Sequence, residues 1–131
     1  MGIFKNAWFR KFSRKEKITD PQLCDAVERA EQGFVDADLG GGVIKQRVAR
    51  QGSGRSGGFR TLLFYKKANR AVFVFGFAKS DRANIGASDE RDLKAAAKLT
   101  LAFSEAEIDR LVELNELEEV FSDAENQNLP Q

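Results

Sequence analysis

The sequence predicts a small α+β protein of one domain. Three observations indicate this fold class: helical patterns near the N-terminus, three consecutive strand patterns between residues 43 and 79, and two helical patterns after residue 88. With 131 residues, of which 42% are apolar, the chain is long enough for one compact core. We expect the domain to span residues 1–121 and residues 122–131, which lack an apolar period, to form a disordered tail.

The N-terminal part is expected to hold a short edge strand and two helices. A few residues from Ile3 onward could pair as a strand. A basic helix over residues 7–15 is predicted by aromatic side chains close to helical spacing, which are Trp8, Phe9 and Phe12. The second helix, over residues 21–32, starts at a capping signal with Pro21 in its first turn and stops at Gly33.

The middle of the chain predicts an antiparallel meander. Residues 34–42 end in three glycines, which permit positive backbone torsions, and are expected to form a loop. Strands follow over residues 43–51, 59–67 and 71–79, with a glycine-rich hairpin connection over residues 51–58. The third strand is apolar on both faces, so it should be the central strand.

The C-terminal part predicts a helical extension from about residue 88. Ser88 with Asp89 is expected to cap the first of its helices. Ser104, with Glu107 three residues later, forms a capping box for the second. Residues 118–121 then return as a short strand.

Positive charge is concentrated in residues 43–79. This segment contains no Asp or Glu, although the whole chain has 21 bases and 20 acids. Its cations are Lys45, Arg47, Arg50, Arg55, Arg60, Lys66, Lys67, Arg70 and Lys79. A rigid sheet that gathers cations offers a platform for a polyanion, and phosphate backbones are the commonest polyanions that a protein meets.

Composition excludes several classes of chemistry. The chain has no histidine and one cysteine, Cys24, so it has no internal disulfide, no usual zinc ligand set and no Ser-His-Asp or Cys-His arrangement. No apolar run is long enough to cross a bilayer, and the N-terminus carries charges where a signal peptide would need its apolar centre. We therefore expect a cytoplasmic protein that uses no cofactor and no metal.

Three of the cations are expected to converge. Lys45 and Arg47 lie two apart on one strand and therefore share a face, and Arg60 follows the hairpin on the partner strand. A lysine amid arginines has its charged form disfavoured and could act as a base, while a guanidinium could hold the charge that develops on a reacting phosphate. Such a set allows RNA cleavage through the 2′-hydroxyl, a group that DNA lacks. The alternative is a solvated sheet edge with long side chains.

Other polar features have simpler structural explanations. The glycines of residues 52–58 match no phosphate-binding loop, because the run joins two strands and does not open a helix. The acids that follow the meander could in principle hold metal ions, but helix capping and surface charge explain them more simply; they are Asp81, Asp89, Glu90 and Asp92. Tyr65 and Cys24 are expected to serve packing.

Three stretches together resemble the RelE/ParE superfamily of bacterial type II toxins, and most closely its RelE and HigB-like branch. They are GVIKQRVAR, GSGRSGGFRTLLFY and VFVFGFAKSDRANI, which cover about residues 43–85, and an alanine-rich helix follows them. The preceding ADLGGG is similar to one subgroup. The resemblance implies N-terminal helices packed on an antiparallel sheet and an mRNA interferase that cleaves mRNA in the ribosomal A site.

The resemblance also implies partners and residue roles. A cognate antitoxin, expected to carry a DNA-binding domain, would suppress the toxin. Lys45 would be the base or acid, Arg60 would stabilise the phosphate, and Arg47 with Arg82 would position RNA. The remaining cations of the pattern would contact RNA or the ribosome; they are Arg50, Arg55, Lys66, Lys67 and Lys79.

The chain departs from some relatives after the last strand. Where those relatives have an arginine and then a catalytic tyrosine, this sequence has Ser80 and, near the expected place, Gly86. Two alternatives to a ribosome-dependent endoribonuclease therefore stay open: a ParE-like inhibitor of DNA gyrase, and a non-catalytic nucleic-acid-binding or regulatory protein. The acidic helix after Ser104 could pack over basic surface or help to bind the antitoxin.

Overall fold

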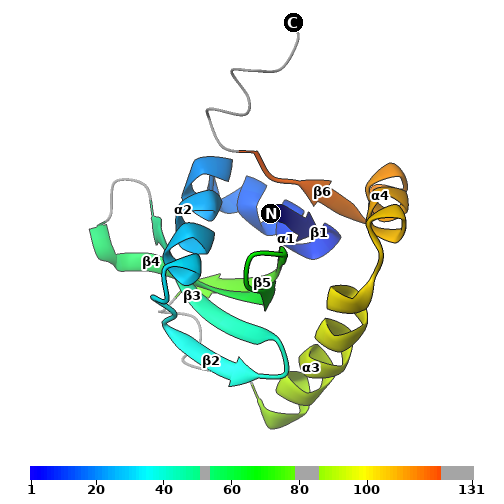
Figure 1. Cartoon of the computed structure of the whole chain (residues 1–131). Coiled ribbons are helices and arrows are strands. Elements are labelled where there is room, and N and C mark those ends of the chain that lie inside the picture. Colours follow the sequence, from blue (N-terminus) through cyan, green and yellow to red (C-terminus); the bar gives the residue numbers. More distant parts are fainter. Residues whose placement is uncertain (51–53, 79–85, 122–131) are drawn as a thin grey trace, which may run out of the picture.

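The computed structural model describes residues 1–50, 54–78 and 86–121, with the backbone alone at residue 50 and at residues 54–57. These residues form four helices and a six-stranded, mostly antiparallel sheet, which confirms the α+β prediction (Figure 1). In chain order the elements are β1 (Gly2–Asn6), α1 (Ala7–Glu16), α2 (Asp20–Glu31), β2 (Ala37–Gly40), β3 (Val43–Arg50), β4 (Gly54–Lys66), β5 (Arg70–Ala78), α3 (Ala87–Ala102), α4 (Glu105–Glu113) and β6 (Leu117–Glu119).

The predicted meander is confirmed. The strand order is β2-β3-β4-β5-β1-β6, with β3, β4 and β5 joined as antiparallel neighbours. As its two apolar faces predict, β5 is an interior strand, and most of its residues are buried. The glycine-rich connection is shorter than expected, because β4 already begins at Gly54 and pairs there with Arg50.

Two predictions at the sheet edges are wrong. The N-terminal strand β1 is not an edge strand, since it pairs in parallel with β5 and antiparallel with β6. Within residues 34–42, expected as a loop, Ala37–Gly40 form β2 and pair with β3. The three glycines still make the turn, with φ values of 83° at Gly40, 63° at Gly41 and 86° at Gly42.

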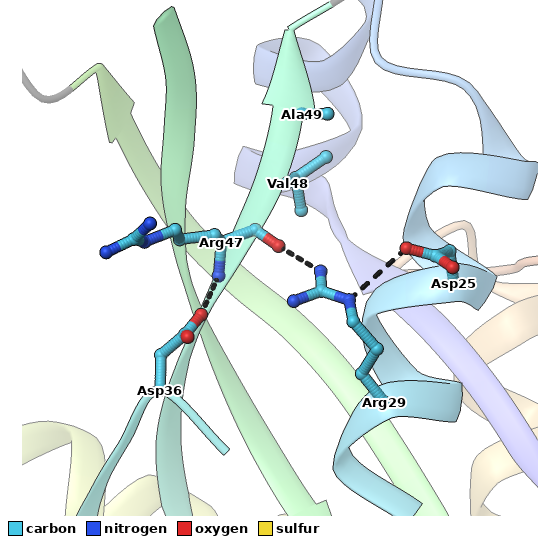
Figure 2. A pocket seen from close by; sticks show the side chains of 6 residues that line it. All are labelled: Asp25, Arg29, Asp36, Arg47, Val48 and Ala49. Atoms are coloured by element: carbon cyan, nitrogen blue, oxygen red, sulfur yellow. Dashed lines mark hydrogen bonds and ion pairs between the residues drawn. The ribbon is translucent and has the colours of Figure 1, made fainter. Parts of the chain in front are cut away.

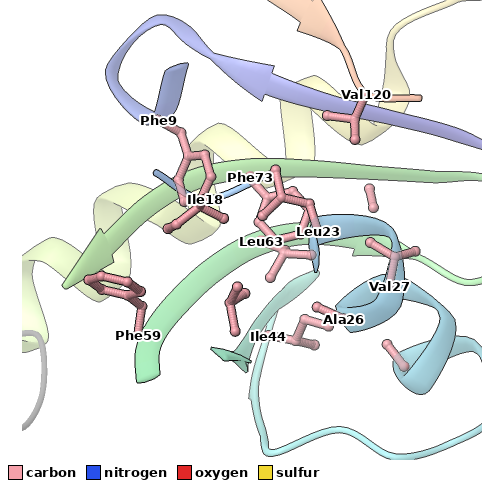
Figure 3. Packing of buried hydrophobic residues seen from close by; sticks show 13 residues of the cluster. Phe9, Ile18, Leu23, Ala26, Val27, Ile44, Phe59, Leu63, Phe73 and Val120 are labelled. Carbon is pink, nitrogen blue, oxygen red and sulfur yellow. The ribbon is translucent and has the colours of Figure 1, made fainter. Parts of the chain in front are cut away.

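The two pairs of helices cover opposite faces of the sheet. Helices α1 and α2 pack on the face that carries Ile44, Gln46 and Val48, which we call the α1–α2 face. Figure 3 shows side chains of this cluster, among them Phe9, Leu23, Leu63 and Phe73. Helices α3 and α4 pack on the other face, the α3–α4 face, through residues such as Ala97 and Ile108. The acidic helix therefore packs within the chain, against apolar residues of the sheet.

Capping explains where the helices begin. The side chain of Asn6 accepts a hydrogen bond from the backbone N–H of Phe9 at 2.8 Å, so α1 starts directly after β1. The predicted capping box of Ser104 and Glu107 is confirmed, with hydrogen bonds of 2.9 and 3.1 Å. The predicted Ser88 cap is wrong, because α3 begins two residues earlier than expected, at Ala87, and Gly86 is its N-cap.

Two buried cations have structural roles. Lys5 of β1, with its side chain only 9% exposed, binds Asp20 at 3.1 Å and Glu118 at 2.9 Å and so ties α2 and β6 to β1. Arg70, counted above with the cations of the basic segment, is buried. Its guanidinium donates to the carbonyl oxygens of Thr100 and Phe103 and pairs with Glu105. Arg70 therefore holds the α3–α4 junction and is not part of a polyanion platform.

Candidate functional site

The sheet register brings Lys45, Arg47 and Arg60 onto the α3–α4 face. Arg47 lies directly opposite Arg60 in the β3–β4 ladder, and Lys45 lies two residues along β3, opposite Leu62. Side chains of directly opposed residues begin only about 5 Å apart. Arg47 is exposed, and Lys45 and Arg60 are partly exposed. We call these three residues the basic triad.

Figure 2 shows how the chain fixes the backbone at Arg47. β2 pairs with β3 only as far as Lys45, and side chains then complete the strand edge. The N–H of Arg47 donates to Asp36 at 2.6 Å, and its carbonyl accepts from Arg29, which pairs with Asp25 at 3.3 Å. The guanidinium of Arg47 points away from Arg29 and Asp25 (Figure 2). These acids therefore bind the Arg47 backbone and Arg29, and the Arg47 side chain projects toward the triad face.

A pocket of about 370 Å³ lies beside this edge, between α2 and β3. Its lining residues are Asp25, Arg29, Asp36, Arg47, Val48 and Ala49. It contains both signs of charge, and several of its polar groups already bind one another. The polar groups that line the pocket therefore hold the strand that carries Arg47, and their mixed charges make the pocket a poor receptor for a polyanion.

Gln46 was not singled out by sequence reasoning, yet it holds the triad strand in place. Gln46 lies between Lys45 and Arg47 in β3, but its side chain points to the opposite, α1–α2 face and is fully buried. It donates to the carbonyl oxygens of Ala26 at 2.9 Å and Phe34 at 3.1 Å, and it accepts from the N–H of Asp36 at 2.7 Å. The sequence pattern could have predicted this role, because Gln46 takes the place of an apolar residue on the buried face of β3 and a buried amide needs hydrogen-bond partners.

Lys66 and Lys67 lie far from the triad. They are exposed at the turn between β4 and β5, six residues along β4 from Arg60, which corresponds to roughly 20 Å. Glu31 organises this end of the sheet, since it accepts from the Tyr65 hydroxyl and from the N–H of Ala68. The Tyr65 hydrogen bond, followed by that of Ala68, lowers the pKa of Glu31. Tyr65 therefore has a specific polar partner beyond the packing role expected of it.

The remaining predicted contacts are only partly described. Arg50 and Arg55 belong to β3 and β4 near the hairpin end of the sheet, the end where Arg47 and Arg60 also lie. Lys79 and Arg82 lie outside the described residues. Gly86, near the position of the relatives' tyrosine, is the N-cap of α3.

Comparison with known proteins identifies the family. Residues 1–120 match the family model described as the RelE toxin of the RelE / RelB toxin-antitoxin system. No curated protein matches the chain. Within the described residues, none of the helices has the length and apolarity needed to cross a membrane. A family with this description implies an antitoxin as partner. Since the match extends over nearly the whole chain, this protein belongs to the RelE family of toxins from toxin–antitoxin systems.

Proposed function

We propose that this toxin is a ribosome-dependent endoribonuclease of the RelE and HigB-like branch that cleaves mRNA and stops translation in the cytoplasm. The observation that carries the proposal is the basic triad, in which Arg47 and Arg60 are cross-strand neighbours and Lys45 shares their face. Binding to a protein target does not require two guanidinium groups opposite each other. Two such groups match the oxygens of one phosphate.

The proposed reaction uses the substrate's own 2′-hydroxyl. The 2′-oxygen gives up its proton and attacks the adjacent phosphorus, the bond from phosphorus to the 5′-oxygen breaks, and the departing 5′-oxygen takes up a proton. Lys45 would serve as the base or the acid in these transfers. Arg60 would stabilise the additional negative charge on the phosphate, and Arg47 would position the RNA. The products are a 2′,3′-cyclic phosphate and a 5′-hydroxyl.

Dependence on the ribosome is consistent with the exposure of the triad. Attack by the 2′-oxygen needs the leaving oxygen on the opposite side of the phosphorus, and a flexible mRNA seldom adopts that geometry alone. A face on which Arg47 is exposed provides little enclosure for holding it. We propose that the ribosome presents the strand and that further cations contact RNA or ribosomal RNA; these are Arg50, Arg55, Lys66, Lys67, Lys79 and Arg82. The cognate antitoxin is proposed to carry a DNA-binding domain.

The test is a reconstituted translation reaction with a defined mRNA, in which new RNA ends are mapped with and without the purified toxin. We expect ends in the ribosome-bound sample and none in naked mRNA. Arg60→Ala should lower the cleavage rate about 100-fold or more, as loss of a charge-stabilising donor does elsewhere. Lys98→Ala, which removes an exposed cation of α3, is the matched control and should leave the rate unchanged.

Two outcomes would refute the proposal. If the mRNA stays intact at high toxin excess, the protein is no ribosome-dependent nuclease, and inhibition of DNA gyrase becomes the next assay. If Arg60→Ala and Lys98→Ala cleave at the same rate, the triad is not the catalytic site.

The double variant Lys66→Ala/Lys67→Ala should raise the KM for ribosomes and leave kcat nearly unchanged, because these cations lie far from the reacting phosphate.

A further inference from the structure

The elbow where α3 ends and α4 begins, residues 99–114, exposes two large apolar side chains. Leu99 of α3 is 66% exposed and Leu114, the C-cap of α4, is 53% exposed. Isolated exposed leucines are common on soluble proteins and need no explanation. These two leucines are not isolated, because the chain between them forms a groove.

The chain between the two leucines lines a mostly apolar pocket of about 360 Å³. Its lining residues are Phe103, Ala106, Glu107, Arg110 and Leu111. Leu99 precedes Phe103 by four residues, and Leu114 follows Leu111 by three, so both leucines continue the helical spacing of the lining residues. We call the pocket together with Leu99 and Leu114 the elbow groove.

The side of α4 that packs on the sheet is a different one. Ile108 is buried, and Val112 packs against the same apolar cluster of the α3–α4 face. Ala106 and Leu114, in contrast, are exposed. Helix α4 is therefore apolar on two sides, of which one faces the core and one is open to solvent. A surface helix needs only the first of these sides for folding.

The elbow groove is preorganised. Arg70 donates to the carbonyl oxygens of Thr100 and Phe103, each at 2.9 Å, and so fixes the end of α3. The capping box of Ser104 and Glu107 fixes the start of α4. A partner that binds a rigid groove pays little conformational entropy for ordering it.

The charge around the groove selects a basic partner. Residues 104–119 contain seven acids and one base, Arg110. Three of the acids pair with bases of the chain: Glu105 with Arg70, Glu113 with Arg110, and Glu118 with Lys5. Asp109 and Glu116 are exposed and have no ion-pair partner in the part of the chain that the structure describes. Such a surface repels RNA and attracts a positively charged protein segment.

The elbow groove lies away from the basic triad. Helix α4 packs against β6, which is three strands from β4 and four from β3, roughly 14–19 Å across the sheet. Figure 1 shows α4 and the hairpin end of β3 and β4 on opposite sides of the molecule. The toxin thus presents two separate surfaces of opposite charge. A partner that contacts both needs a basic segment at the elbow and an acidic one at the triad.

We propose that the elbow groove binds a basic amphipathic helix of the cognate antitoxin. The family match implies this protein partner. Apolar side chains of the antitoxin helix, three and four residues apart, pack against Leu99, Phe103 and Leu114, while its Lys or Arg side chains face the acidic rim. The inference rests on the family and not on the nuclease function, so the two can be tested separately.

The first test uses the full toxin in complex with its co-expressed antitoxin. Amide hydrogen exchange of residues 99–116 should be slower in the complex than in the free toxin. Synthetic peptides of 20 residues that tile the antitoxin sequence are then titrated into the toxin. The peptide that binds at the elbow should carry net positive charge and apolar residues at helical spacing. Unchanged exchange at the elbow, or binding there by acidic peptides alone, would overturn the proposal.

Variants of the exposed leucines test the apolar contact. The double variant Leu99→Ser/Leu114→Ser should weaken antitoxin binding roughly 10- to 100-fold, because most of the surface of both side chains is buried only in the complex. Leu99→Met/Leu114→Met should restore most of the affinity. Phe34→Ser, which removes a 67% exposed aromatic ring at another place, is the matched control and should bind like the parent chain. Equal affinities of the serine double variant and this control would refute the proposal.

Charge reversal tests the acidic rim. Glu113→Lys should weaken antitoxin binding at low salt and make the Kd less dependent on salt, since an attraction between charges is replaced by a repulsion. Glu28→Lys reverses an exposed charge on α2 and is the matched control. If Glu113→Lys binds more tightly than the control, the segment at the elbow is acidic and the proposal is wrong.

The two proposals fail in different ways. The serine double variant should cleave mRNA like the parent toxin, because the elbow lies away from the triad. If cleavage depends on Arg60 but antitoxin binding ignores the elbow variants, the elbow inference is wrong and the nuclease function stands. If the antitoxin needs the elbow but no mRNA is cut, the nuclease function fails and the elbow inference stands. If the leucine variants change only the mass of the free toxin in sedimentation, the groove joins two copies of this chain and the inference is refuted.

Discussion

Replacing Arg70 by methionine should destabilise the fold without touching the basic triad. The Arg70 side chain is 4% exposed at the start of β5. Its guanidinium donates to the carbonyl oxygens of Thr100 and Phe103, each at 2.9 Å, and lies 3.2 Å from Glu105. Methionine keeps most of the apolar stem but cannot donate. The substitution therefore leaves the carbonyl groups at the end of α3 without this partner.

The expected loss follows from these contacts. A hydrogen bond from a charged donor contributes about 1.5–3 kcal/mol, and two such bonds give roughly 3–6 kcal/mol before the desolvation of the buried guanidinium is subtracted. Glu105 is 84% exposed, so its ion pair adds less than about 1 kcal/mol. We expect Arg70→Met to lower the free energy of unfolding by about 2–4 kcal/mol.

Urea denaturation followed by circular dichroism measures this difference, with an unchanged m-value as the check for two-state unfolding. Arg110→Met is the matched control, because the Arg110 side chain is 71% exposed and lies 3.9 Å from Glu113. The control should change stability by less than about 0.5 kcal/mol. If both variants lose the same small amount, Arg70 does not hold the α3–α4 junction and the reasoning is refuted.

Two further predictions concern the α1–α2 face. Tyr65→Phe removes the main hydrogen bond that lowers the pKa of Glu31 below its ordinary value of 4.5. A carboxyl group whose pKa is lowered on folding stabilises the fold at pH values above its unfolded-state pKa, and this contribution is lost as the pH falls through its folded-state pKa. The urea midpoint of the parent chain should therefore fall more steeply below pH 4.5 than that of the variant. Parallel curves of urea midpoint against pH would contradict this. Gln46→Met removes the three hydrogen bonds of a buried side chain at similar volume and should reduce the free energy of unfolding by about 2–4 kcal/mol. The exposed Gln32→Met should change it by less than about 0.5 kcal/mol, and equal urea midpoints of the two variants would disprove the role of Gln46.

Local sequence patterns predicted most elements of this fold. The apolar spacing of α1 and α2, the capping signal of α2 and the alternation in β3 to β5 give bounds within one residue of those observed, except that β4 begins five residues earlier than predicted. The same alternation predicted that Lys45, Arg47 and Arg60 share a face, because side-chain direction in a strand depends only on residue parity. The roles of these three residues stay a prediction.

Features that depend on distant pairing were not predictable in this way. The position of β1 beside β5 depends on partners about 70 residues away, and no local pattern encodes it. The burial of Arg70 depends on the carbonyl groups at the end of α3, so its side chain resembles a surface cation until the helix is in place. Trp8 fits the helical period of the core but projects at the edge that β1 leaves open.

The place of β1 in the sheet has a consequence for synthesis of the chain. β1 pairs with residues 70–73 of β5 on one side and with residues 117–119 of β6 on the other. The second side of β1 therefore stays without its partner until β6 has been synthesised. A nascent chain that has not yet reached residue 117 lacks the β6 carboxylate that binds Lys5 and keeps one edge of β1 unpaired. The β1–β6 pairing therefore forms only after residues 117–119 have been translated.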